Sequence, residues 1–314
     1  MSPQIQSIIL RLTNASAIVA QEVIQNLWSD YGEIVRIKLL ESEYSSVVVK
    51  HIQHGAAGNH PRGWNSDIGH QRKLKSYEVE TAWYDRYALT SKARIPRCIA
   101  VEHLENEILI VLEDLNASGF NLRKSEVSWT EMEACIQWLA QYHAGFIGME
   151  PERLWEVGTY WHLATRPNEL EALDDVALKN AASAIDEQLN SCTYKTLVHG
   201  DAKLANFCFS PNGEVAGVDF QYVGGGCGMK DLAYFVSSCL YEEDCERYET
   251  RILNTYFRHL QNSLPIPNPE LEAEWRSLYH VAWADFHRFI KGWSPGHWKI
   301  NSYSERVTKA VIGR

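Results

Sequence analysis

Apolar positions in the first third of the chain predict strands. Residues 33–40 alternate apolar and polar side chains, which is the period of a half-buried strand. Val47–Val49 is a β-branched run that ends at Lys50, and residues 107–112 form a continuous apolar run. The chain therefore opens with a region in which strands dominate.

Helical patterns come before and after these strands. Residues 14–29 carry apolar side chains at every fourth position and predict an opening helix. Residues 73–89 predict a second helix. Ser128 and Glu131 have the spacing of a capping box, which predicts the start of a third.

The stretch HGDAKLANFCFSPNGEVAGVDFQ, residues 199–221, predicts a loop followed by a hairpin. Residues 206–209 and 215–218 have the pattern of its two arms, and Ser-Pro-Asn-Gly between them is a strong turn signal. Such a hairpin would bring Asn206 and Asp219 toward each other.

Asp201, Asn206 and Asp219 are the groups that phosphoryl transfer from ATP requires. One carboxylate orients a hydroxyl and accepts its proton, while an amide and a second carboxylate hold Mg²⁺ against the phosphates. Taken singly, an Asp or Asn beside a turn is usually a cap or a turn residue. The complete string H-G-D-x-x-x-x-N followed by V-D-F is hard to reach by chance, so it predicts chemistry.

This string resembles the catalytic segments of the protein-kinase-like superfamily, in the branch of aminoglycoside phosphotransferases, choline kinases and ecdysteroid-kinase-like proteins. Its Val-Asp-Phe-Gln ending is most similar to the last of these. The resemblance implies ATP and Mg²⁺ as cofactors, Asp201 as the catalytic base, and Asn206 and Asp219 as Mg²⁺ ligands. It implies an α+β, two-lobed protein-kinase-like fold, with an antiparallel sheet plus helix in the N-lobe and a larger, mostly helical C-lobe.

The resemblance assigns roles to further charged residues. Lys50 would face the α- and β-phosphates, held by Glu80 on the helix at 73–89. Glu78 is the alternative partner, although it points about 200° away on a helix. Lys203 resembles the lysine that neutralises charge on the transferred phosphoryl group in protein serine/threonine kinases.

The apolar strand ending at Leu112 resembles the strand and hinge that bind adenine in kinase-like folds. By position, the Glu113 carbonyl and the Leu115 N–H would meet the adenine edge, and Leu112 would line the pocket behind. The alternative is an acidic turn after a core strand.

The protein-kinase glycine-rich loop is absent. In its place we expect the turn after residues 33–40, where Ser45 and Ser46 offer donors to phosphate, although two nearby glutamates would repel it. Residues 51–72 form a long Gly- and His-rich segment. It is either a surface excursion or a lid that brings Arg62, Arg72 or Lys73 to the phosphates.

Other residues around the motif are expected to support it. His199 would brace the loop by hydrogen bonds, and His143 would be packed in the core. Asp231 resembles the residue that ties down the catalytic loop, and an N-cap explains it equally well. Gly224–Gly226 is expected to be a flexible turn.

The sequence does not identify the molecule that accepts the phosphoryl group. Trp275, Tyr279, Trp283 and Phe286 have helical spacing, which is more typical of core than of a binding site. Aromatic faces could also stack a sugar or sterol, or hold a quaternary ammonium with Asp285 as counter-charge.

Composition narrows the possible partners and the cellular compartment. The chain of 314 residues has a formal net charge of −10, which disfavours nucleic acid or an anionic membrane as partner. Seven cysteines without a C-x-x-C pair favour free thiols in a reducing compartment. There is no apolar run of transmembrane length and no signal-peptide pattern. We expect a cytoplasmic protein, monomeric or weakly dimeric.

Together these patterns predict a nucleotide-binding N-lobe at 1–114, and a C-lobe at 115–314 with the catalytic loop, metal site and acceptor pocket. The predicted reaction moves the γ-phosphoryl group of Mg-ATP to a hydroxyl of an amino alcohol, sugar, aminoglycoside or sterol-like molecule. The alternatives are a nucleotide-binding pseudokinase-type regulator and a protein kinase. The presence of Lys50, Asp201, Asn206 and Asp219 argues against the regulator. The absence of the glycine-rich loop argues against a protein kinase.

Overall fold

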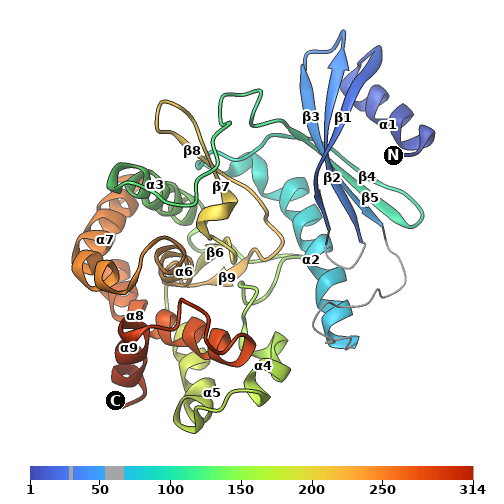
Figure 1. Ribbon diagram of the computed structural model, residues 1–314. Coiled ribbons are helices and arrows are strands. Elements are labelled where there is room, and N and C mark those ends of the chain that lie inside the picture. Colours follow the sequence, from blue (N-terminus) through green and yellow to red (C-terminus); the bar gives the residue numbers. More distant parts are fainter. Residues whose placement is uncertain (28–30, 54–66, 314) are drawn as a thin grey trace.

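The computed structural model describes residues 1–27, 31–53 and 67–313, which form two lobes (Figure 1). The lid hypothesis rests largely on residues 54–66, including Arg62, and this part lies outside the described residues. The predicted fold class is confirmed: one lobe holds an antiparallel sheet with helices, and the larger lobe is mostly helical.

The smaller lobe is built on a five-stranded sheet in the order β1-β2-β3-β5-β4. Every pair of neighbouring strands is antiparallel. The strands are β1 (Ala17–Asn26), β2 (Gly32–Leu40), β3 (Ser46–Gln53), β4 (Cys98–His103) and β5 (Glu107–Glu113).

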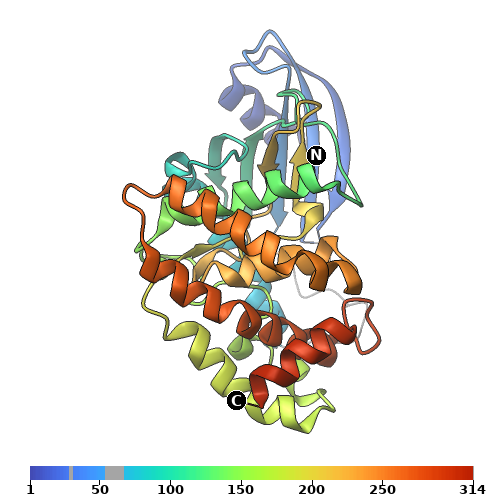
Figure 2. The ribbon, with the colours of Figure 1, turned by 90° about the vertical axis from the view of Figure 1, so that its left-hand side faces the viewer.

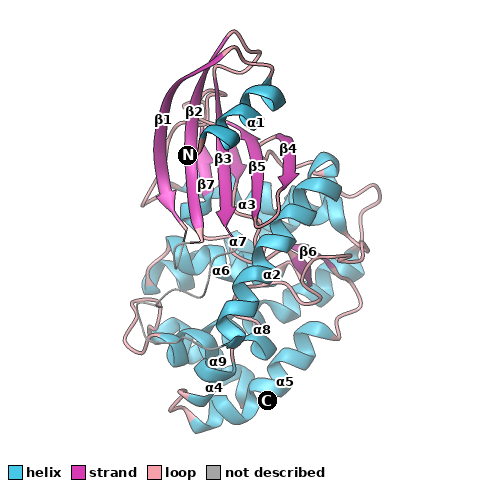
Figure 3. Cartoon of the chain, turned by 90° about the vertical axis from the view of Figure 1, so that its right-hand side faces the viewer, coloured by secondary structure: helices cyan, strands magenta, loops and turns pink. Residues whose placement is uncertain are grey.

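Helices α1 (Pro3–Thr13) and α2 (Asp67–Arg86) pack on opposite faces of this sheet (Figures 1 and 3). Val47 and Val49 of β3 join the core cluster of α1, whereas Ile52 joins the cluster of α2. Successive strand side chains point to opposite faces, so Lys50 shares the α2 face with Ile52. Burial on both sides explains why β3 is continuously apolar before Lys50.

The helix predicted at 14–29 is wrong, because residues 17–26 form the edge strand β1. A spacing of four residues keeps side chains on one face of a strand as well as of a helix. The β-branched residues of this segment favour the strand. The opening helix is instead α1, where Ser2 is the N-cap and Ile5 and Ile9 are buried.

The larger lobe packs its long helices around a shared core (Figure 2). Two short antiparallel pairs, β6 with β9 and β7 with β8, carry the motif of residues 199–221. None of the helices within the described ranges is long and apolar enough to cross a membrane. The elements are α3 (Trp129–Phe146), α4 (Pro167–Glu171), α5 (Val176–Asn190), β6 (Thr196–Val198), β7 (Phe207–Phe209), β8 (Val215–Gly217), β9 (Gly224–Gly226), α6 (Met229–Cys239), α7 (Glu242–Ser263), α8 (Pro269–Trp293), α9 (Ser302–Ile312) and the 3₁₀ turns η2 (Ala88–Thr90), η3 (Leu163–Thr165) and η4 (Leu204–Asn206).

Gly224–Gly226 is strand β9 and not the flexible turn that the sequence predicts. A Cβ at Gly224 would lie 2.2 Å from the Trp155 carbonyl oxygen, and one at Gly225 would lie 2.7 Å from the Glu156 carbonyl oxygen. The glycines therefore allow a neighbouring backbone segment to lie directly against β9.

The loop that carries Asp201 is anchored by Asp231 in the first turn of α6. The Asp231 carboxylate accepts hydrogen bonds from the backbone N–H groups of His199 at 2.5 Å and Gly200 at 2.9 Å. It also contacts the Nε2 of buried His143 at 3.0 Å. The expected tie-down of the loop and the packed position of His143 are both observed.

Gly200 is required by this arrangement. Its φ is +78°, and a Cβ there would lie 2.1 Å from the Tyr222 carbonyl oxygen. Gly213, in the turn between β7 and β8, also has a positive φ, +84°, but a Cβ there would meet no atom within 4 Å. A comparison of Gly200 with Gly213 therefore distinguishes the cost of a positive φ from the cost of steric overlap.

We predict that Gly200→Ala lowers the free energy of unfolding by at least about 3 kcal/mol, because strain and overlap with a backbone add. The control Gly213→Ala adds only the left-handed penalty, about 1 kcal/mol. Denaturant unfolding of both variants measures this difference. Equal losses would show that the close packing at Gly200 does not govern the loop.

Candidate active site

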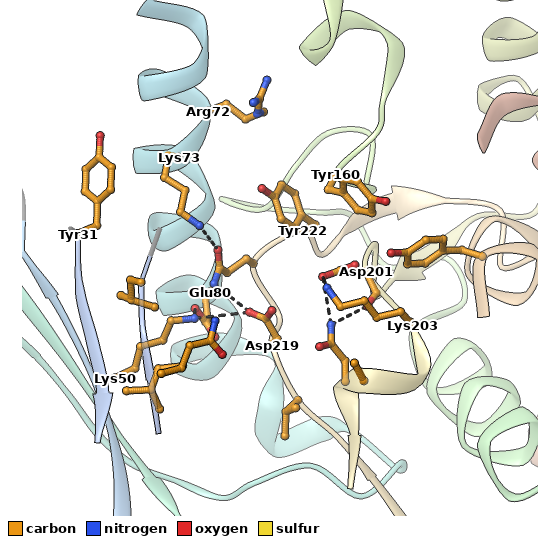
Figure 4. Close-up of a pocket in the computed structure, with 18 of the residues that line it drawn as sticks. Tyr31, Lys50, Arg72, Lys73, Glu80, Tyr160, Asp201, Lys203, Asp219 and Tyr222 are labelled. Carbon is orange, nitrogen blue, oxygen red and sulfur yellow. Dashed lines mark hydrogen bonds and ion pairs between the residues drawn. The ribbon is translucent and has the colours of Figure 1, made fainter. Parts of the chain in front are cut away.

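A cavity of about 1060 Å³ lies between the sheet lobe and the helical lobe, and residues of both line it (Figure 4). Most of the residues predicted from the sequence lie in its walls: Lys50, Glu80, Leu112, Glu113, Leu115, Asp201, Lys203, Asn206 and Asp219.

The sheet and α2 meet at a buried ion pair. Lys50 Nζ lies 2.5 Å from Glu80 Oε2 and 3.5 Å from Asp219 Oδ1, so one ammonium contacts both lobes. Burial opposes its charge, but the two carboxylates outweigh burial and hold the pKa of Lys50 above its ordinary value. Glu78, the alternative partner, instead contacts Lys75 at 3.7 Å on the surface.

Asp201 has one engaged and one unengaged carboxylate oxygen. Its Oδ2 accepts hydrogen bonds from Lys203 Nζ at 2.9 Å and from Asn206 Nδ2 at 3.1 Å. Its Oδ1 is buried and makes no hydrogen bond of ordinary geometry among the described residues, and the Tyr234 hydroxyl lies nearby, since Asp201 adds to burial and Tyr160 in raising the pKa of Tyr234. Burial raises the pKa of Asp201, against the lowering effect of Lys203. A buried, unpaired carboxylate oxygen is the arrangement expected of a proton acceptor.

The amide of Asn206 is oriented by the loop. Its Nδ2 donates to the Asp201 carbonyl oxygen at 2.7 Å. Because the Asp201 carbonyl oxygen can only accept, the Asn206 amide nitrogen must face it, and Asn206 Oδ1 points in another direction. Asn206 and Asp219 line the same cavity, and both offer hard oxygens. Mg²⁺ takes few protein ligands and completes its shell with water and phosphate, so this pair fits it.

Asp219 is held in an uncommon backbone conformation, with φ +72°. Such strain in a residue other than glycine is concentrated at functional sites. Its carboxylate remains 35% exposed and accepts a hydrogen bond from Gln221 Nε2 at 2.9 Å. Although burial opposes ionisation, Lys50 and Lys203 hold the pKa of Asp219 below its ordinary value. Asp219 is therefore ionised.

Gln221 links Asp219 to α2, a connection that sequence reasoning did not predict. Its Oε1 accepts hydrogen bonds from Lys73 Nζ at 3.1 Å and Ser76 Oγ at 3.2 Å. Burial, followed by the neighbouring Lys50, lowers the pKa of Lys73 to about 8. Gln221 thus forms a bridge between the two lobes.

The hinge residues Leu112, Glu113 and Leu115 line the cavity. The Glu113 side chain is engaged with Arg94, at 2.6 and 3.0 Å. Burial would raise its pKa, but the hydrogen bonds from Arg94 and other donors lower it to about 2. With the carboxylate occupied, the backbone of this segment is the part available to a ligand.

Ser45 and Ser46 do not join the other predicted residues. Ser45 precedes β3 and Ser46 is its first residue, at the end of the strand remote from Lys50, and the Ser46 hydroxyl donates to Asp114 Oδ2 at 2.6 Å. The cavity is lined instead by residues flanking the β1–β2 connection, including Leu27 and Tyr31. Since residues 17–26 were predicted to be helical, the sequence did not predict a hairpin at this end of the cavity.

The other end of the cavity, beyond Asp201, is lined by aromatic side chains. Phe286 takes part, but Trp275, Tyr279 and Trp283 belong to the central core. Asp285 is not available as a counter-charge, because it accepts from Trp161 Nε1 at 2.9 Å and Arg288 Nη2 at 2.8 Å. The remaining lining residues come from separate elements, so no local pattern could have predicted them; they include Tyr160, Arg166, Tyr222, Tyr234, Phe289 and Lys299.

Comparison with solved structures gives the fold. An aminoglycoside phosphotransferase variant in complex with ADP and hygromycin B is 12% identical, with a TM-score of 0.51, over 99% of this chain and 98% of that chain. The choline kinase LicA from Streptococcus pneumoniae is 13% identical, with a TM-score of 0.50, over 99% of this chain and 100% of that chain. A candidate fructosamine-3-kinase from Haemophilus somnus 129PT is 12% identical, with a TM-score of 0.51, over 98% and 95%.

Comparison of the sequence gives the family. A search of curated proteins finds no match. The model of the ecdysteroid kinase-like family matches residues 77–156 and 152–266, which is more than half of the chain and includes Glu80, the catalytic-loop motif and Asp219. The predicted resemblance is confirmed, and the chain belongs to the ecdysteroid kinase-like family, whose fold is that of small-molecule phosphotransferases.

Proposed function

We propose that the protein transfers the γ-phosphoryl group of Mg-ATP to a hydroxyl of a small molecule, with Asp201 as the base. The observation that carries this proposal is the unpartnered buried Oδ1 of Asp201, in the same cavity as Lys50 and Asp219. Family membership supports it, and one of the similar structures contains ADP.

Nucleotide binding falls to residues 1–114 and their border with the second lobe. The backbone at Glu113 and Leu115 would meet the adenine, with Leu112 behind it. Lys50, positioned by Glu80, would bind the α- and β-phosphates. Residues 115–314 would supply the catalytic loop and the acceptor site.

Asn206 and Asp219 would hold Mg²⁺. When bound, the ion neutralises charge on the phosphate oxygens and orients them for transfer. Gln221 and Lys50 keep the Asp219 carboxylate in place from two sides.

Asp201 would orient the acceptor hydroxyl and take its proton. As the hydroxyl O–H bond breaks, an O–P bond forms to the γ-phosphorus, and the bond from that phosphorus to the β–γ bridging oxygen of ADP breaks. Lys203, bonded to Asp201 at 2.9 Å, would stabilise charge on the phosphoryl oxygens. The barrier is lowered mainly by positioning and charge neutralisation.

We predict that Asp201→Asn lowers Mg-dependent phosphorylation of an accepted alcohol by about 10²–10⁴-fold, because the amide cannot accept the proton. Nucleotide affinity should change little. The panel contains amino alcohols, sugars, aminoglycosides and sterols, and ADP release is the readout. Asp174→Asn, at an exposed position, is the control.

Three outcomes separate the alternatives. Unchanged turnover in Asp201→Asn would contradict the assignment of the base. Nucleotide binding without turnover of any acceptor would favour a pseudokinase-type regulator. Transfer to proteins and to no small molecule would favour a protein kinase.

The pH dependence gives an independent test. A base works deprotonated, so kcat/KM falls as the pH drops through the pKa of Asp201. Burial raises that pKa and Lys203 lowers it. We predict that Lys203→Ala moves the acid limb to higher pH and lowers the plateau by about 10²-fold. Exposed Lys92→Ala is the control. An acid limb at the same pH in Lys203→Ala and the parent would contradict the coupling.

A further inference from the structure

The part of the cavity beyond Asp201 is a chamber with aromatic walls, formed by Tyr160, Tyr234, Phe286 and Phe289. The ring centroids of Tyr160 and Tyr234 are 5.5 Å apart, those of Tyr234 and Phe286 are 4.9 Å apart, and those of Tyr160 and Phe289 are 5.3 Å apart. The chamber adjoins the catalytic carboxylate, since Asp201 adds to burial in raising the pKa of Tyr160. Tyr160 is partly buried, and Tyr234, Phe286 and Phe289 are buried around it, so this end of the cavity has an apolar aromatic lining that suits a ring-bearing ligand.

Lys299 places an ammonium group against these walls. Its Nζ lies 4.6 Å from the ring centroid of Tyr234 and 5.2 Å from that of Phe286. In the part of the chain that the structure describes, this Nζ lies over aromatic rings and within ion-pair distance of no carboxylate. Burial lowers the pKa of Lys299 to about 8, although Asp201 opposes this. Among the described residues the ammonium has no ion-pair partner, and Asp201 acts on it only at longer range.

The carboxylates of the cavity are already matched. Among the described residues its wall contains eight lysine or arginine side chains and six carboxylates. Each of the six has a basic side chain within ion-pair distance: Glu80 with Lys50, Glu113 with Arg94, Asp114 with Arg36, Glu169 with Arg166, Asp201 with Lys203 and Asp219 with Lys50. Asp201 keeps its Oδ1 outside these pairs, but Lys299 Nζ lies beyond ion-pair distance of every carboxylate among the described residues.

A second cation adds to the excess of positive charge at this end of the cavity. Arg72 lines the same cavity, and its Nη1 donates a hydrogen bond to the Thr165 carbonyl oxygen at 2.8 Å, which neutralises no charge. Arg166 is paired with Glu169 at 3.1 Å. The chamber thus has a positive excess inside a protein whose net charge is −10.

We infer that the phosphate acceptor is a hydroxylated ring compound that carries a negatively charged group, and that Lys299 determines this specificity by pairing with the group. The ring body would lie against Tyr160, Tyr234 and Phe289, with its hydroxyl at Asp201. A cationic acceptor is disfavoured, because an ammonium already occupies the aromatic faces and Asp285 is paired elsewhere. This inference rests on the proposed function, since it concerns the acceptor of that reaction.

The test uses three matched probes: a hydroxymethyl-naphthalene bearing a carboxylate, a primary amide or an aminomethyl group at the same ring position. Calorimetric titration of Mg-ADP comes first and tests nucleotide binding alone. The three probes are then titrated into the protein saturated with Mg-ADP. We expect the carboxylate to bind about 10- to 100-fold more tightly than the amide, and the amine most weakly.

Variants assign this preference to Lys299. In Lys299→Met the difference between carboxylate and amide should fall to about threefold or less, whereas Lys299→Arg should retain it. Lys309→Met, which removes an exposed lysine of α9, is the control. Melting temperatures verify that each variant is folded.

Failure of Mg-ADP to bind would contradict the proposed function itself. If Mg-ADP binds, three results would overturn the inference alone: tightest binding of the amine, an unchanged carboxylate preference in Lys299→Met, or no binding of the carboxylate probe. An equal loss for all three probes in Lys299→Met would show that the lysine only packs the chamber.

Discussion

The buried contact of Lys50 with Glu80 and Asp219 is the interaction on which the cavity depends. It joins β3, α2 and the segment after β8 through one ammonium group, at 2.5 and 3.5 Å. Removing one partner of a buried ion pair typically costs about 3–5 kcal/mol, because the other charge stays buried without compensation. The two lobes are therefore held by charges that also face the proposed phosphate site.

A second set of polar contacts extends this arrangement on each side. Gln221 connects Asp219 to Lys73 on α2. Asp231 fixes the backbone of His199 and Gly200, which sets the position of Asp201. Gln221 and Asp231 are themselves buried and hydrogen-bonded, so the side chains of the site are held in place by rigid neighbours. The strained backbone at Asp219 persists because these contacts over-determine it.

The sequence predicted the parts of the site whose residues are close along the chain. Asp201, Asn206 and Asp219 lie within one loop and hairpin, and local turn chemistry is enough to bring them together. Glu80 was chosen over Glu78 from the family resemblance, and helical geometry placed the two on different faces. In contrast, residues 17–26 have a spacing that fits both helix and strand, and only pairing with β2 resolves it. With these residues taken as a helix, the first hairpin that the sequence predicted was the one that holds Ser45 and Ser46, and the phosphate loop was expected there.

The sequence could not predict the acceptor chamber, and the reason is physical. Tyr160, Tyr234 and Lys299 are far apart along the chain and meet only because α6, α8 and the intervening loops pack together. The predicted aromatic stripe of α8 divides between core and chamber along the length of the helix, since Trp275, Tyr279 and Trp283 pack in the central core and Phe286, further along the same face, reaches the chamber. Charge balance in the chamber likewise depends on which carboxylates are already paired, and a sequence does not show that.

The central claim is that the γ-phosphoryl group leaves ATP and reaches a hydroxyl. It is tested most directly by incubating the protein with Mg²⁺, a hydroxylated acceptor mixture and ATP labelled with ¹⁸O on the γ-phosphate, followed by mass spectrometry. The account predicts ADP together with a phosphate monoester that carries the labelled oxygens. Bound nucleotide with the label retained entirely in ATP would contradict it.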